Sequence, residues 1–153
     1  MLLNKRYLVI AIAISIAGFT YFSLKPIEKK FTFEQETREA AANVMSLYLE
    51  EGILGLIALS KECYEHDKIS AETCFINDVT SKALDVTITN AMKVPAEEYF
   101  FDDSVVQRLL KHDKKNYFTK ENTSVYISQI TKVAEDQLVI EWNLQKHKLE
   151  SNE

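Results

Sequence analysis

The sequence predicts a mainly helical protein: a single transmembrane helix, then a small helical domain that ends in a β-hairpin (α+β). Three observations lead to this fold class. An uncharged apolar run spans residues 7–24, glycine and proline number only three and two in 153 residues, and apolar side chains recur at helical spacing over most of the remaining chain. So few turn-forming residues argue against a sandwich, barrel or propeller. The chain after the apolar run is long enough for one domain with its own core.

Residues 7–24 have the length and composition of a membrane-spanning helix. They carry no charge, amide or proline, and as a helix they would measure about 27 Å, close to the thickness of the hydrocarbon core. Ser15 and Ala17 are small enough for a signal peptide to be cleaved after Ala17. Because the apolar character continues past that point to Leu24, we expect an uncleaved signal-anchor.

This anchor divides the chain into five parts. We expect a short cytoplasmic stub, the transmembrane signal-anchor, a basic juxtamembrane link, an exported mainly helical domain and a polar tail, at residues 1–6, 7–24, 25–31, 32–145 and 146–153. Basic residues are nearly balanced across the anchor, so its orientation depends on the size of the two flanks. A short stub and a large body favour a single-pass protein of the bacterial inner membrane, with the body in the periplasm or at the cell exterior.

Capping residues and apolar runs predict the helices of the exported domain. A capping-box spacing at residues 32–35 predicts a helix start, and residues 53–59 are apolar all round, as expected of a buried element. Gly52 and Gly55 either break this helix or let a neighbour approach closely, and the apolar setting favours close approach. Ser70 is suited to cap the next helix.

The chain after Pro95 contains a shorter helix and then changes character. Val105, Val106, Leu109 and Leu110 predict a helix that ends in lysines. Residues 123–130 are rich in β-branched and aromatic side chains, and residues 138–144 alternate between apolar and polar positions over part of their length. The two segments predict a hairpin around residues 133–137, and a terminal helix from Asp136 is the competing interpretation.

Charge is distributed unevenly along the chain. The first thirty residues hold five of the 18 basic residues and one of the 23 acidic ones, which leaves 13 basic against 22 acidic residues and a net charge of −9 in the body. Such a body repels phosphate backbones and anionic headgroups, so without a local basic patch we expect no nucleic-acid partner. A cluster of four lysines at residues 111–120 is interrupted by Asp113 and followed by Glu121, and we interpret it as a solvated face.

Cys63 and Cys74 are the only cysteines. They fall at the end of one predicted helix and in the first turn of the next, where two side chains can reach disulfide distance. In an oxidising compartment we expect them to form a disulfide. A zinc site with His66 is a weaker alternative, because a fourth ligand such as Glu62 must be added, and two free buried thiols are the third possibility.

Motifs for catalysis are missing from the sequence. The three histidines, His66, His112 and His147, are embedded in charge, and we find no nucleophile elbow, metalloprotease helix, phosphate-binding glycine loop or CxxC. The acidic pairs at 97–98 and 102–103 have the residue types of glycosidase carboxylates, but such pairs are expected by chance in so acidic a body. We therefore predict no enzyme activity, metal or cofactor.

An acidic and aromatic segment at residues 97–103 is the candidate partner-binding site. It consists of Glu97, Glu98, Tyr99, Phe100, Phe101, Asp102 and Asp103. One interpretation buries all three aromatic side chains where the chain turns between helices. The other is an aromatic hot spot ringed with negative charge, suited to capture a basic protein.

Together these features predict a membrane-tethered, exported acidic domain that binds a basic protein, as an inhibitor or immunity protein does. In architecture alone, the chain is similar to bacterial envelope interaction proteins, including toxin-neutralising immunity proteins. The alternative is a small accessory subunit of a membrane complex, whose anchor pairs with other helices through small residues between Ala11 and Gly18. A hydrolase is disfavoured.

Overall fold

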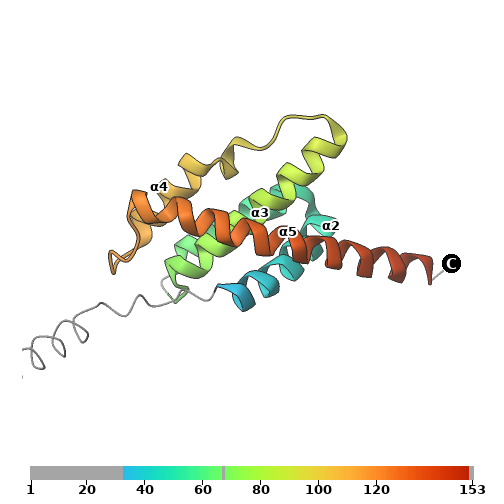
Figure 1. Ribbon diagram of the computed structural model, residues 1–153, viewed down its shortest axis with the longest axis horizontal. Coiled ribbons are helices and arrows are strands. Elements are labelled where there is room, and N and C mark those ends of the chain that lie inside the picture. The colour runs from blue at the N-terminus through green and yellow to red at the C-terminus, as the bar shows by residue number, and fades with distance from the viewer. Residues whose placement is uncertain (1–32, 67, 152–153) are drawn as a thin grey trace, which may run out of the picture. The chain divides into compact units, whose positions relative to one another are not determined.

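A computed structural model describes residues 33–66 and 68–151, and within these residues the protein is helical without any strand. The mainly helical prediction is therefore confirmed. The predicted stub, anchor and link at residues 1–31 lie outside the described residues. The elements, shown in Figure 1, are α2 (Glu34–Glu65), α3 (Ala71–Met92), the short 3-10 helix η1 (Glu98–Phe100), α4 (Asp102–His112) and α5 (Lys120–Glu150).

Helix α2 bends at Gly52. The backbone there has φ 67° and ψ −159°, a conformation that favours glycine because it lacks a Cβ. Gly55 is buried, and a Cβ at this position would lie 2.5 Å from Cβ of Glu51. Gly52 therefore breaks the helix, against the preference for close approach, and the contacts at Gly55 are with side chains of α2 itself.

By length and composition, α2 could also cross a membrane, with a mean hydropathy of 1.4 over its most apolar stretch. Only 22% of that stretch is buried in the body, so burial alone does not decide whether α2 is a core helix or a membrane-spanning helix. The acidic pair Glu50 and Glu51 and the break at Gly52 interrupt α2, and both disfavour a membrane-spanning helix. Its buried side chains also pack against α3 and α5, so we assign α2 to the body.

The main hydrophobic core lies where α2, α3, η1 and α5 meet. Its buried members are Ala41, Val44, Met45, Leu56, Ala83, Leu84, Phe100, Ala134 and Leu138. A second group of side chains is aromatic and joins the start of α2 to α3 and α5. Phe33 contacts Tyr126, Tyr126 contacts Phe118, and Phe118 contacts Phe75, with ring centroids 5.6, 5.8 and 5.6 Å apart.

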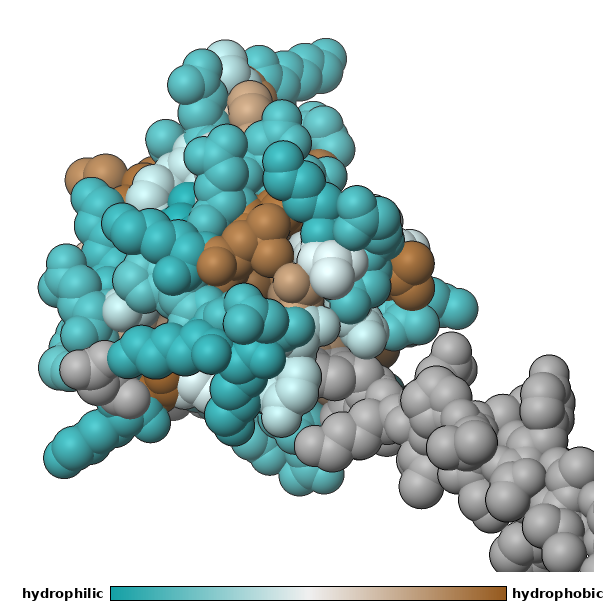
Figure 2. Space-filling view, turned by 90° about the vertical axis from the view of Figure 1, so that its left-hand side faces the viewer, coloured by the Kyte–Doolittle hydropathy of each residue, from teal (hydrophilic) through white to brown (hydrophobic). Residues whose placement is uncertain are grey.

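These aromatic contacts define one end of the body, which we call the entry end because the chain enters the described domain there at Phe33. The turn between α2 and α3 and the loop at residues 113–119 lie at the same end, since both line one pocket beside Phe118. Figure 2 views the molecule from the side that is on the left of Figure 1, and shows a largely hydrophilic surface around a small hydrophobic patch.

The predicted C-terminal β-hairpin is wrong, because residues 120–150 form the single helix α5. Its side chains Ile127, Ile130, Ala134 and Leu138 are buried at spacings of three and four residues, which is the period of a helix face and not of a strand. β-branched residues disfavour a helix only weakly, so burial of this face outweighs local propensity.

The start of α5 carries a capping pattern. Thr119 Oγ1 accepts a hydrogen bond from the Asn122 backbone N–H at 3.3 Å, and Asn122 Oδ1 accepts one from the Thr119 N–H at 2.9 Å. This reciprocal pair has the geometry of a capping box, with asparagine in place of glutamate. The cap predicted at Ser70 is confirmed, because Ser70 Oγ accepts a hydrogen bond from the Thr73 N–H at 3.1 Å.

Cys63 and Cys74 form a disulfide, as predicted. Their Cα atoms are 5.6 Å apart, and the bond joins the end of α2 to the first turn of α3. Both side chains are buried. The zinc and free-thiol interpretations are wrong, since each sulfur is bonded to the other.

Replacing both Cys63 and Cys74 by alanine should lower the free energy of unfolding by about 3 kcal/mol, because the bond closes a short loop in the unfolded chain. Urea denaturation of the two proteins measures this loss. Reduced wild-type protein should show the same loss as the double variant. An unchanged midpoint in both cases would contradict a stabilising disulfide.

Candidate functional site

The structure separates the three aromatic side chains of the candidate segment 97–103. Phe100 is 1% exposed and belongs to the core, whereas Phe101 is 47% exposed at the start of α4. Tyr99 lies between these extremes and packs edge-on against Phe100, with ring centroids 5.1 Å apart. The segment is thus a core anchor with one exposed aromatic neighbour.

Tyr99 is held from two sides by polar contacts. Its hydroxyl shares a hydrogen bond of 3.0 Å with the Ser60 hydroxyl on α2. The guanidinium of Arg108, on α4, lies 3.9 Å from the centre of the Tyr99 ring and stacks on its face. Tyr99 is therefore fixed between α2 and α4.

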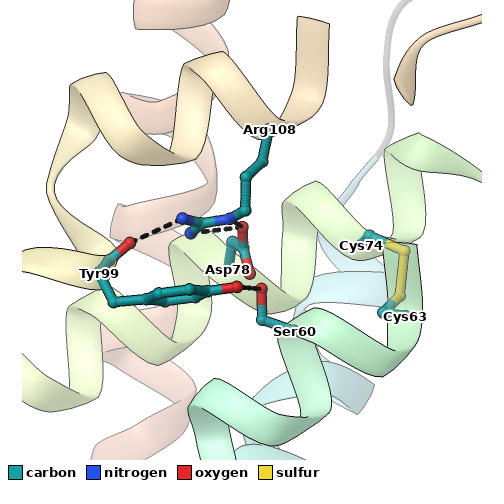
Figure 3. A network of polar contacts seen from close by, with 6 residues as sticks. All are labelled: Ser60, Cys63, Cys74, Asp78, Tyr99 and Arg108. Carbon is teal, nitrogen blue, oxygen red and sulfur yellow. Dashed lines mark hydrogen bonds and ion pairs between the residues drawn. A yellow bond between two sulfur atoms is a disulfide. The ribbon is translucent and has the colours of Figure 1, made fainter. Parts of the chain in front are cut away.

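Arg108 connects this segment to the buried Asp78 of α3, as Figure 3 shows. Its Nε donates a hydrogen bond to Asp78 Oδ2 at 2.9 Å, and its Nη2 lies 2.8 Å from the same oxygen. Its Nη1 donates to the Tyr99 carbonyl oxygen at 2.9 Å. One guanidinium thus joins α3 and α4 to the segment between them, an arrangement that positions the backbone around Tyr99.

Burial raises the pKa values of two acidic groups in this network, Asp78 and Tyr64. Asp78 is fully buried, and loss of solvation raises the pKa of its carboxyl group, while the charge of Arg108 opposes that shift. The pKa of the Tyr64 hydroxyl is raised by burial and by the nearby charge of Asp78. The nearby hydroxyls of Ser60 and Tyr64 also favour the charged carboxylate, and Arg108 supplies its counter-charge.

The acidic residues of the segment have several structural partners. The Glu97 backbone N–H donates a hydrogen bond to Asp85 Oδ2 at 2.7 Å, and burial raises the pKa of Asp85. Asp102 forms an ion pair with Lys82. Asp102 and Asp103 both lie in the first turn of α4, where the helix dipole favours acidic side chains. Glu98, Phe101, Asp102 and Asp103 form the exposed surface of the segment.

A second exposed surface, absent from the sequence-based candidates, lies at the C-terminal end of α5. The buried stripe of α5 runs through Ile130, Ala134 and Leu138, and its next position four residues on is Trp142, which is 55% exposed. We call residues 139–150 the α5 overhang, because they project beyond the rest of the body (Figure 1). Among the described side chains of the overhang, Val139, Ile140 and Leu144 are also large, apolar and exposed.

The spacing of the α5 stripe contained the signal for this surface. Ile130, Ala134, Leu138 and Trp142 recur every four residues, but the partial alternation over residues 138–144 favours a strand. A helix whose apolar stripe continues past the body that covers it presents an uncovered apolar face.

No protein-family model matches the sequence, and neither the curated proteins nor the solved structures include a significantly similar chain. The described residues define the body as a small disulfide-bonded helical bundle with an apolar helix end exposed.

Proposed function

We propose that the protein is a membrane-tethered domain that acts outside the cytoplasm by binding another protein. The α5 overhang is the observation that carries this proposal. Trp142 continues a buried apolar stripe yet is 55% exposed, and tryptophan is among the residues that dominate binding energy at protein interfaces. A soluble body that exposes grouped apolar side chains commonly uses them for association.

Two features support a location outside the cytoplasm. Disulfides form and persist in oxidising compartments such as the periplasm, and Cys63 and Cys74 are bonded. Residues 7–24 have the length and apolarity of a signal-anchor. A single-pass protein of the bacterial inner membrane, with its body in the periplasm, accounts for both.

The charge of the body favours a basic partner. It carries a net charge of −9, and opposite charges speed the encounter of two proteins. The exposed residues of segment 97–103 add an acidic surface around Phe101. An inhibitor or immunity protein that holds a basic toxin or enzyme inactive at the membrane is the form of binding that this charge supports.

The Trp142→Ala variant tests the proposed binding surface. Full-length protein, captured from its native membrane, identifies the partner, whose affinity for purified variants is then measured. Trp142→Ala should weaken binding by about thirtyfold, on the order of 2 kcal/mol, with an unchanged melting temperature. Val125 is the matched control, because it lies on the same helix and is 54% exposed. Equal losses for Val125→Ala and Trp142→Ala, or none for either, would contradict the surface.

The acidic segment makes a separate kinetic prediction. If the surface around Phe101 steers a basic partner, Glu98→Lys and added salt should both slow association and leave dissociation almost unchanged. Phe101→Ala should instead speed dissociation. Stopped-flow or surface plasmon resonance measurements separate these two rates. Association rates that do not depend on salt would exclude the basic partner.

An accessory subunit of a membrane complex is the second candidate function, favoured by the small residues within 11–18. Exchanging residues 7–24 for an unrelated transmembrane helix distinguishes the two. Binding by the α5 overhang should survive this exchange, whereas recognition through the anchor should be lost.

A further inference from the structure

We infer that the entry end of the body docks on the outer surface of the membrane through an exposed cluster of lysines with Tyr117 and Ile69. This inference rests on the proposed membrane anchor. Its occupant is the bilayer itself, with anionic headgroups.

The length of the link between anchor and body restricts which end can reach the membrane. Residues 25–32 separate the apolar run from Phe33, and eight extended residues span at most about 28 Å. By contrast, α5 alone contains 31 residues and extends about 46 Å along its axis. An anchor at residues 7–24 therefore holds the entry end close to the bilayer.

The entry end is organised as a pocket of about 200 Å³ beside the disulfide. Ile69 and Tyr117 line it and are exposed large apolar side chains, Tyr117 at 61%. Tyrosine suits the boundary between headgroups and hydrocarbon, because its ring is apolar and its hydroxyl is polar. The exposed Tyr117 in this pocket is therefore of the residue type that is enriched at membrane interfaces.

Lysines make the segment at residues 111–120 locally basic within an acidic body. Residues 111–120 contain four lysines and one acid, whereas the body as a whole has a net charge of −9. Two of these lysines, Lys114 and Lys115, line the pocket, together with the acids Glu72 and Asp113. The carboxylate of Asp113 accepts hydrogen bonds from the backbone N–H groups of Lys115 and Phe118, which fix the loop. Basic side chains next to exposed aromatic ones are suited to anionic headgroups.

Docking of this kind needs only weak contacts. The anchor makes the encounter intramolecular, so the local concentration of headgroups is high without any tight site. Docking of the entry end would also direct the α5 overhang away from the bilayer, because Trp142 lies 22 residues, or about 33 Å, along α5 from Lys120. The overhang would then be accessible to a partner in the compartment.

Fluorescence quenching by brominated lipids tests the inference on the full chain. The native protein has one tryptophan, Trp142, which reports on the far end of α5. A full-length double variant, Trp142→Phe with Tyr117→Trp, moves this reporter to the entry end, and Ile69→Trp in the same background provides a second reporter position. Each protein is placed in vesicles with brominated phosphatidylglycerol. The tryptophans introduced at 117 and 69 should lose about half of their emission, with a blue shift, and native Trp142 should be almost unquenched.

The charge dependence is tested in the same vesicles. Changing Lys114 and Lys115 to glutamate in the Tyr117→Trp background should reduce the quenching at position 117, as should brominated lipids that are zwitterionic only. Quenching that is insensitive to both changes would overturn the role of the lysines.

Carbonate extraction separates failure of the docking from failure of the anchor. Protein that is extracted from the vesicles would disprove the anchor, and with it the proposed tethering. Protein that resists extraction while positions 117 and 69 stay unquenched would overturn the docking and leave the anchor intact. Equal quenching at 117 and 142 would overturn the end-on orientation.

Discussion

Replacing Arg108 by methionine should lower the free energy of unfolding by about 3–5 kcal/mol at pH 7, because it leaves the buried carboxylate of Asp78 without its counter-charge. Asp78 is fully buried, and Arg108 supplies both the ion pair and a hydrogen bond to it. The variant also loses the stacking on Tyr99 and the hydrogen bond to the Tyr99 carbonyl oxygen.

The loss should depend on pH. Burial raises the pKa of Asp78 above its ordinary value, and removal of Arg108 should raise it further. When the pKa of a carboxyl group is higher in the folded than in the unfolded protein, protonation of the group favours the folded state. Its contribution to the free energy of unfolding is fully present below the unfolded pKa of about 3.9 and is lost as pH rises through the folded pKa. Urea denaturation of Arg108→Met and wild type should therefore show a smaller difference at about pH 4 than at pH 7.

A double variant separates the loss of the ion pair from the loss of packing. Asp78→Leu together with Arg108→Met should recover much of the stability that Arg108→Met loses, since an apolar pair of similar volume often replaces a buried ion pair at little cost. A loss in Arg108→Met that is the same at both pH values, and that Asp78→Leu does not relieve, would show that the carboxylate is not the cause.

Phe100→Ala should lower the free energy of unfolding by about 3–5 kcal/mol, because it removes a fully buried ring from the core and leaves a cavity. Phe101→Ala, one residue on, should change stability by no more than about 0.5 kcal/mol, since exposed side chains contribute little. The two rings are 1% and 47% exposed. Thermal and urea unfolding of the two variants measure the contrast, and similar losses at both positions would contradict the placement of segment 97–103.

Local signals predicted those parts of the fold that depend on nearby residues. The cap at Ser70 and the pairing of Cys63 with Cys74 follow from a sequence separation of three and eleven residues. The error in α5 has the opposite origin. Its β-branched residues and short alternation suggest strands, but the burial of Ile130 and Leu138 against other helices decides the structure.

The candidate site was predicted only in part for the same reason. The sequence indicated either burial of all three aromatic side chains or an exposed hot spot, whereas the structure buries Phe100 and exposes Phe101. The ion pair between Asp78 and Arg108 was not predictable, because the two residues are 30 positions apart in the sequence and meet only in the folded bundle. The exposure of Trp142 was not predictable either, because it depends on how far along α5 the other helices pack.

Stability and the proposed recognition depend on different residues. The Asp78–Arg108 pair and the disulfide join neighbouring helices within the body, whereas the exposed apolar side chains of the α5 overhang contribute little to the core. Variants in the overhang should therefore affect binding without unfolding the protein.

Photo-crosslinking at position 142 is the most direct test of protein binding through the α5 overhang. A benzophenone amino acid replaces Trp142 in the full-length protein, which is irradiated in its native membrane, and the same amino acid replaces Val125 as the control on α5. We expect a discrete adduct with a second, different protein at position 142 and not at position 125. Absence of an adduct at 142, the same adducts at both positions, or an adduct only with another copy of this chain would contradict the proposed function.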